Sequence, residues 1–128
     1  MEFNAADIFE GVVDRIPDRE AVVLGSTRLT YKELDSRTNK AANALKKLGI
    51  EKGSHIGIYA FNCIEWLEVM LGAYKLCAIP ININYRYVEE ELKYLIDNAD
   101  MEAVFYHKQF GTKLNNIKND LPVLKNFI

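Results

Sequence analysis

Residues 78–98 of this chain read AIPININYRYVEEELKYLIDN, and this stretch decides the fold. The apolar run Ala78–Ile81 is typical of a buried strand, and Val88–Asn98 is typical of a helix whose first turn carries carboxylates. The polar loop Asn82–Tyr87 between them holds a lone arginine, Arg86. Open α/β sheets bind ligands beyond the carboxyl ends of their strands, so Arg86 is the first candidate binding residue.

The alternation of strand and helix continues on both sides of this stretch. The apolar run Ile56–Ala60 suits a strand covered on both faces, and the nearly all-apolar segment Ile64–Leu76 predicts a deeply buried helix. Because strands joined by helical crossovers run parallel, the sequence predicts an α/β fold, a three-layer helix/sheet/helix with a mostly parallel sheet. The other predicted elements are a first helix between Asn4 and Pro17, a small N-terminal β-hairpin at 21–24 and 28–30, a long helix from Thr30 to Gly49, a strand at 103–106, a weaker helix at 110–119 and an apolar run at 123–128.

Local signals mark the ends of the long helix. Thr30 to Glu33 has the form of a capping box, in which each residue's side chain accepts from the backbone amide of the other. Gly49 stands where a left-handed residue ends the helix. The first helix places Ile8, Phe9, Val12, Val13 and Ile16 at helical spacing, which predicts a helix that docks on the rest of the fold.

Composition bounds the class of protein. The chain has 128 residues, of which 49% are hydrophobic, and its 16 basic and 18 acidic residues give a net charge of -2. We expect one globular unit over residues 1–128, and the dispersed charge argues against nucleic acid as a partner. No segment reaches the ~20 apolar residues that span a bilayer, and the first residues lack a signal-peptide pattern. A soluble, cytoplasmic protein without a transmembrane segment is expected.

The chain ends inside what reads as a further strand and its crossover, which leaves a sheet edge open. An uncovered edge is a liability for an independent protein, so we expect a fragment of a larger domain. The alternative is a non-catalytic binding or assembly module, a homo-oligomer that dimerises through this exposed sheet edge.

The two cysteines are expected to be free thiols in the core. Cys63 and Cys77 flank the predicted helix, which separates them by roughly 20 Å at 1.5 Å per residue. A disulfide needs Cα atoms within ~7 Å of each other. With His55 and His107 as the sole histidines, no metal site is expected.

The sequence contains no complete catalytic constellation. Its seven glycines are dispersed and form no phosphate loop, and neither a nucleophile elbow nor a His-Glu-x-x-His helix occurs. Asn62 either caps the following helix or touches a ligand at the sheet edge. Glu89, Glu90 and Glu91 are expected to form a solvated first turn. Arg86 either pairs with Glu89 or Glu90, or its planar charged fork holds a phosphate.

A series of short motifs, each weak alone, occurs in one order along nearly the whole chain. The motifs are Leu29–Leu34, Lys46–Gly49 leading through Lys52-Gly53 to the strand His55–Ala60, Asn62 and Trp66, Gly72–Leu76 before Ile79–Asn82, and Asn84–Tyr87 before Glu91–Leu95. Together they resemble the N-terminal region of the AMP-forming acyl-CoA synthetases, which belong to the adenylate-forming enzymes. The stretch from Asn82 to Met101 is most similar to bacterial ligases for fatty acids or steroid side chains.

The resemblance implies an incomplete part of the large N-terminal domain of these enzymes, and a two-step reaction in the full-length enzyme. A carboxylic acid reacts with ATP to form an acyl-adenylate, and the thiol of coenzyme A then displaces AMP. The residues that hold ATP and Mg2+ come later in the family, so this chain alone is expected to be inactive, with no cofactor tightly bound and no catalytic residue. In related ligases an arginine after Asn-Pro contacts the 3′-phosphate end of CoA. Asn84-Tyr85-Arg86 matches that motif with tyrosine in place of proline, which makes Arg86 the candidate cofactor-binding residue.

Overall fold

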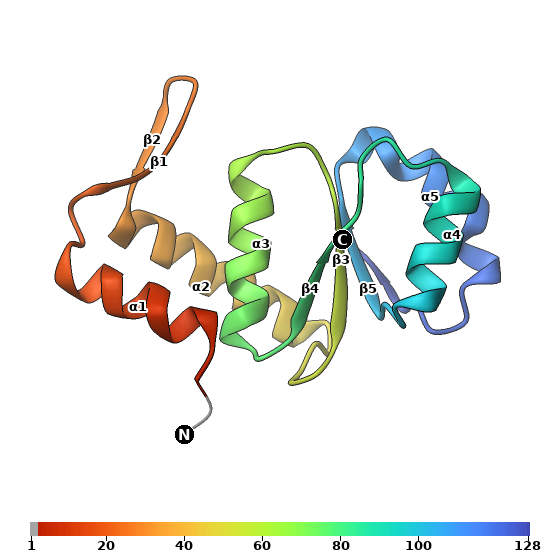
Figure 1. The fold of residues 1–128 in the computed structure, drawn as a ribbon, viewed down its shortest axis with the longest axis horizontal. Coiled ribbons are helices and arrows are strands. Elements are labelled where there is room, and N and C mark those ends of the chain that lie inside the picture. Colours follow the sequence, from red (N-terminus) through yellow and green to blue (C-terminus); the bar gives the residue numbers. More distant parts are fainter. Residues whose placement is uncertain (1–2) are drawn as a thin grey trace.

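The computed structural model describes residues 3–128, and Figure 1 shows an N-terminal helix and hairpin beside an α/β unit. The hairpin and the central sheet are separate, because β1 pairs with β2 and the other four strands pair among themselves. The elements in chain order are α1 (Ala5–Arg15), β1 (Glu20–Leu24), β2 (Thr27–Thr30), α2 (Tyr31–Lys47), β3 (His55–Tyr59), α3 (Ile64–Lys75), β4 (Ile79–Asn82), α4 (Glu89–Asn98), β5 (Ala103–Tyr106), the 3-10 turn η1 (Lys108–Phe110), α5 (Gly111–Ile117), the 3-10 turn η2 (Lys118–Asp120) and β6 (Asn126–Phe127).

The central sheet is parallel throughout and has the strand order β4-β3-β5-β6. Gly57 in β3 lies opposite Ile81 in β4 and Val104 in β5, so β3 is an inner strand. The mostly parallel sheet and the small antiparallel hairpin are therefore confirmed, with strand ends shifted by one residue at β3 and β4. The last apolar run contributes the short strand β6, which pairs with β5.

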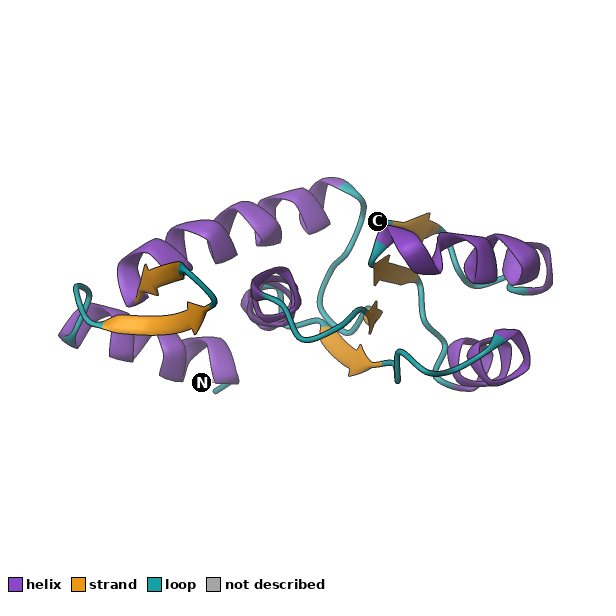
Figure 2. Ribbon diagram, turned by 90° about the horizontal axis from the view of Figure 1, so that it is seen from above, coloured by secondary structure: helices purple, strands orange, loops and turns teal. Residues whose placement is uncertain are grey.

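Helices cover both faces of the sheet, which confirms the three layers. In Figures 1 and 2, α2 and α3 lie on one side of the strands and α4 and α5 on the other. Each face has its own apolar core. The core under α4 and α5 contains Tyr59, Ile83, Leu92, Ile96, Met101, Val104, Phe110, Leu114, Ile117 and Leu121. The core on the opposite face contains Leu45, Ile50, Ile56, Ala73, Ala78 and Ala103.

Helix α3 is less buried than the sequence predicts. Ile64, Val69, Leu71, Gly72 and Ala73 are buried, whereas the other apolar side chains of the helix are half-exposed. The first helix likewise docks on one side only, because Ala6 is its buried residue while Ile8 is 56% exposed. Helical periodicity identifies the apolar positions, but how far each is covered depends on neighbouring elements.

The ends of α2, α3 and α4 share one geometry. The residue after each C-cap is left-handed, with φ of +88° at Gly49, +56° at Cys77 and +50° at Asp100. At each helix end the next amide donates to a carbonyl five residues earlier, as Ala78 does to Ala73 at 2.9 Å. Gly49 is thus confirmed as a C-terminal cap, and the predicted Thr30–Glu33 capping box is present.

Lys75 ties the three helices of the N-terminal half together. Its ammonium group contacts Asp35 of α2 at 2.9 Å and also pairs with Glu10 of α1, and its side chain is 9% exposed. Burial by itself lowers the pKa of Lys75, but the two carboxylates outweigh it and the pKa lies above its ordinary value. This contact explains how α1 is held although its apolar face is only partly covered.

Within residues 3–128, no helix combines the length and the apolar character needed to cross a membrane.

Candidate functional site

The strand order creates a crevice at the carboxyl edge of the sheet. The chain leaves β3 toward α3 on one face, and it leaves the neighbouring strand β5 toward α5 on the other face. Ligands of open α/β sheets bind where neighbouring strands diverge in this way. The residues that arrive at this point are Phe61 after β3 and His107 after β5.

Aromatic rings from three connections meet here. The ring of Phe61 lies 4.8 Å from that of Tyr85, 5.2 Å from that of Phe110 and 6.1 Å from that of His107. Below them, Tyr59 stacks on Phe110 with their centroids 4.4 Å apart. Phe61 and Tyr85 are 38% and 39% exposed, so the upper side of this cluster faces solvent. Such exposed rings can stack on a planar ligand.

The loop that carries Arg86 is held firmly although it lacks the proline of the family motif. The side-chain oxygen of Asn84 accepts from the Arg86 amide at 3.0 Å, and its carbonyl accepts from the Tyr87 amide at 3.0 Å. The carbonyl of Tyr87 accepts from the Tyr59 hydroxyl at 2.9 Å and from the Lys113 ammonium at 3.2 Å. Asn84 therefore fixes the turn that a proline would otherwise restrict.

The guanidinium of Arg86 stays on the surface. Its central carbon lies 5.5 Å from the centroid of the Tyr85 ring, and the residue is exposed. No ion pair joins Arg86 to Glu89 or Glu90 in the part of the chain that the structure describes, so the predicted structural pairing is absent. The Glu89 carboxylate instead accepts from the Asn116 side chain at 3.2 Å.

The pKa of Glu89 lies below its ordinary value for local reasons. A backbone hydrogen bond within Glu89 is the largest cause, followed by the hydrogen bond from Asn116 and the charge of Lys113. The other capping interaction comes from Glu91, whose carboxylate accepts from the Val88 amide at 2.9 Å. These contacts agree with a solvated first turn of α4.

Asn62 does not cap α3. The N-cap position belongs to Cys63, whose side chain makes no capping hydrogen bond, and Asn62 lies one residue earlier. Asn62 is exposed and lines a cavity of about 160 Å³ together with hairpin residues such as Val23 and Leu24. The capping prediction was wrong, because α3 begins at Ile64 and its N-cap is therefore Cys63.

Both cysteines are free thiols, as predicted, but they are half-buried rather than fully buried. Burial is the main cause that raises the pKa of the Cys63 thiol. The sulfur of Cys77 accepts from the side-chain amide of Asn4 at 3.4 Å. Both thiols therefore have structural roles, through packing and hydrogen bonding.

Exposed aromatic rings and an exposed arginine lie around the crevice. Among residues 3–128, no group of three His, Cys, Asp or Glu side chains could hold a metal ion. Sequence reasoning singled out Arg86, which stays a prediction, but did not single out Phe61, His107, Phe110 or Lys113. Phe61 and His107 could have been found, because each follows the end of a predicted parallel strand. Lys113 and Phe110 carried no such signal, since their positions depend on how η1 and α5 return over the sheet.

Comparisons with known proteins identify relatives along the whole chain. The chain is 39% identical over 128 residues to a 3-oxocholest-4-en-26-oate–CoA ligase of Rhodococcus rhodochrous. It is 42% identical over 128 residues to a medium/long-chain-fatty-acid–CoA/3-oxocholest-4-en-26-oate–CoA ligase of Mycobacterium marinum. In both cases all of this chain is covered, and it spans 23% of the length of the relative.

The fold is equally well matched among solved structures. The inhibitor-bound N-terminal domain of FACL13 from Mycobacterium tuberculosis superposes with a TM-score of 0.94 at 25% identity, over 99% of this chain and 33% of that one. The anthranilate CoA ligase AuaEII, in complex with anthranoyl-AMP, superposes with a TM-score of 0.92 at 26% identity, over 98% of this chain and 24% of that one. A family model described as AMP-binding enzyme matches residues 9–127. On this evidence the chain belongs to the AMP-binding enzyme family.

Proposed function

We propose that this chain forms the N-terminal part of an ATP-dependent acyl-CoA ligase. The full-length enzyme activates a carboxylic acid as an acyl-adenylate and then transfers the acyl group to CoA. The observation that carries the proposal is the 39% and 42% identity, over all 128 residues, to curated CoA ligases. Their names point to long-chain fatty or steroid side-chain acids as the substrate class. The use of ATP and CoA is consistent with the cytoplasmic location expected from the sequence.

The adenylation chemistry is assigned to the remainder of that enzyme. Magnesium and ATP would be held there, because the resemblance to the AMP-forming acyl-CoA synthetases places the ATP-binding residues later in the chain. This chain supplies the parallel sheet, part of the wall beside the carboxylic acid, and a cationic rim at the carboxyl edge. A pyrophosphate-release assay with ATP and fatty acids should show no turnover by residues 1–128. Turnover would refute the assignment of the adenylation chemistry to the remainder of the enzyme.

Within the proposed ligase, Arg86 contacts a phosphate of CoA. Three features support this role: the guanidinium is exposed, it is not engaged by a carboxylate among residues 3–128, and its turn is fixed by Asn84. Lys113 adds a second positive charge next to the same loop, since its ammonium contacts the Tyr87 carbonyl. A planar guanidinium is well suited to bidentate contact with phosphate oxygens.

The test uses the complete ligase that carries this segment. Arg86→Ala should raise the KM for CoA about fivefold to tenfold, the effect of losing one solvent-exposed charged contact, while adenylate formation stays nearly unchanged. Arg86→Lys should retain part of the affinity. Arg28→Ala is the matched control, because it removes an exposed arginine that pairs with Glu20 in the hairpin. An unchanged KM for CoA in Arg86→Ala would exclude the proposed contact.

The second candidate function is an assembly module, and the sheet edge is the observation that favours it. Among the described strands, β6 has one neighbour, and Phe127 on this edge is 39% exposed. A dimer would form if β6 of two copies paired. Light scattering of the 128-residue chain should give a dimer mass under this hypothesis, and a monomer mass at high concentration would rule it out.

A further inference from the structure

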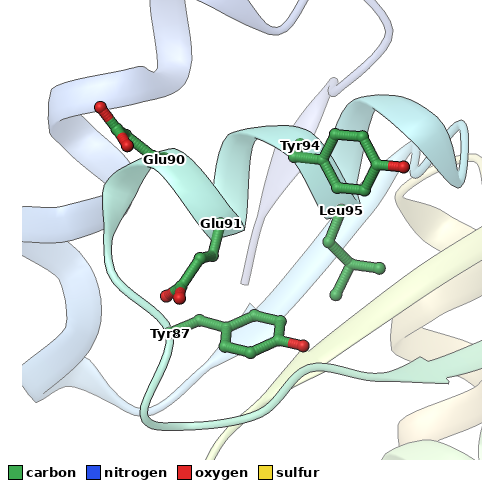
Figure 3. A pocket seen from close by; sticks show the side chains of 5 residues that line it. All are labelled: Tyr87, Glu90, Glu91, Tyr94 and Leu95. Atoms are coloured by element: carbon green, nitrogen blue, oxygen red, sulfur yellow. The ribbon is translucent and has the colours of Figure 1, made fainter.

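A groove between α4 and the loop that ends at Tyr87 shares none of its lining residues with the aromatic cluster of Phe61, Tyr85, His107 and Phe110. Its volume is about 360 Å³, and it is lined by Tyr87, Glu90, Glu91, Tyr94 and Leu95. Figure 3 shows Glu91 and Leu95 on the side of α4 that faces Tyr87, with Tyr94 extending to one side and Glu90 pointing away from the other four side chains. This volume is near the lower limit for ligand sites, which fits one side chain or one small head group.

Neither carboxylate of this groove forms an ion pair with any of residues 3–128. Glu90 makes no hydrogen bond or ion pair with any of residues 3–128, and Glu91 uses one carboxylate oxygen for the Val88 amide. Three cations lie near in the sequence or on α4: Lys93 contacts Asp120 at 3.4 Å, Lys113 contacts a backbone carbonyl, and the Arg86 guanidinium lies 5.5 Å from the Tyr85 ring centroid. The helix N-terminus contributes about half a positive charge, which is less than these carboxylates carry.

Two tyrosine residues line the same groove as these glutamates. Tyr94 is 71% exposed and Tyr87 is half-buried, so a ligand in the groove can reach both rings. The ring face of tyrosine attracts cations, and a carboxylate next to it adds an ion pair. Leu95 supplies an apolar floor for the stem of a long side chain.

We propose that the groove binds an arginine side chain of a partner protein. A guanidinium satisfies all three kinds of lining at once: it stacks on an aromatic ring, it donates in a plane to carboxylate oxygens, and its aliphatic stem covers apolar surface. An ammonium group cannot stack in this way. The groove includes neither Arg86 nor Lys113, and its test does not require ligase activity.

The experiment is a titration of the isotopically labelled 128-residue chain with a short peptide that contains one arginine, followed by NMR. The backbone amides of residues 87–95 should shift with a dissociation constant of about 10–100 mM, as expected for one ion pair and one ring contact. The same peptide with citrulline, which is neutral and nearly isosteric, should produce no saturable shift. Replacing the arginine by lysine should weaken binding severalfold.

Variants separate the ring from the charge. Tyr94→Ala should weaken binding about twofold to fivefold, whereas Tyr94→Phe, which keeps the ring, should not. Glu90→Gln should weaken it by a similar factor, and Asp14→Asn, which removes the same charge from an exposed site on α1, should leave it unchanged. Equal binding of the citrulline peptide, equal binding of the lysine peptide, or concentration-dependent self-association through residues 87–95 would each overturn the proposal.

Discussion

Gly57→Ala tests how closely the central strand packs against the core under α4 and α5. Gly57 lies in the middle of β3 with strands on both sides. A Cβ atom added there would lie 2.6 Å from the sulfur of Met101, 2.7 Å from Cδ1 of Ile83 and 3.3 Å from Cγ2 of Val104. Carbon atoms at optimal contact are about 3.5–4.0 Å apart, so the first two neighbours must move by roughly 1 Å.

The cost follows from the absence of free space. Met101 and Ile83 are 0% and 1% exposed, so neither can move into solvent, and each must leave its preferred conformation or displace its neighbours. Overpacking of this kind costs about 1–3 kcal/mol. With a urea dependence of about 2 kcal/mol/M, a 2 kcal/mol loss lowers the unfolding midpoint by about 1 M.

Urea unfolding of the 128-residue chain measures this effect, with circular dichroism and the fluorescence of the single tryptophan, Trp66, as probes. Gly11→Ala is the matched control, because a Cβ at this helical position meets nothing within 4 Å. It should stabilise the chain by about 0.5–1 kcal/mol. Ile83→Val removes one clashing carbon, so its usual cost of about 0.5–1.5 kcal/mol should shrink in the Gly57→Ala background. A Gly57→Ala midpoint equal to that of the unmodified chain would refute the packing argument.

Three further predictions concern stability. The hydroxyl of Thr38 is buried without a hydrogen-bond partner among residues 3–128. Thr38→Val should therefore raise the free energy of unfolding by about 1 kcal/mol in urea titrations. A lower free energy of unfolding would mean that the hydroxyl has a hydrogen-bond partner. Cys77→Gly relieves a left-handed conformation and should gain about 0.5 kcal/mol, whereas Cys77→Ala keeps the strain and should show no such gain. Burial is the main cause that raises the pKa of Tyr59, and the charge of Glu89 adds to it. Burial lowers the pKa of Lys75, but Glu10 and Asp35 outweigh it and raise this pKa above its ordinary value. Because both folded pKa values lie above the unfolded values of 10.0 and 10.5, the stability that each group contributes is complete below its unfolded pKa and is lost as pH rises through its folded pKa. Urea midpoints should accordingly fall between pH 9 and about pH 12, less steeply in Tyr59→Phe.

Much of the fold follows from local sequence patterns. The parallel sheet was predictable because β3, β4 and β5 are apolar runs separated by segments of helical length. The Gly49 cap and the Thr30–Glu33 box were predictable because both depend on residues close in the sequence. By contrast, the left-handed conformations of Cys77 and Asp100 were not predictable, because neither residue is glycine. The hydrogen bonds of the following amides impose these conformations.

The candidate site was predictable in part for a similar reason. Arg86 is conspicuous as a single charge between a strand and a helix. The absence of an ion pair with Glu89 was not predictable, because the Glu89 carboxylate accepts from Asn116, which lies 27 residues after Glu89. The aromatic cluster joins three connections, and its distances follow from the strand order β4-β3-β5. Long-range pairings of this kind require the folded chain.

The long-range contacts of α1 affect how the chain folds during synthesis. Its capping residue Asn4 contacts Cys77, 73 residues later, and Glu10 contacts Lys75, 65 residues later. At synthesis rates of about 5–20 residues per second, α1 waits roughly 3–15 s before its partners on α3 have been made. During this interval α1 can pack against α2 alone, where the Phe9 and Tyr31 ring centroids lie 6.4 Å apart. The ribosome-bound nascent chain therefore leaves the part of α1 that contacts α3 uncovered until α3 is complete, and this interval is when a chaperone could bind α1.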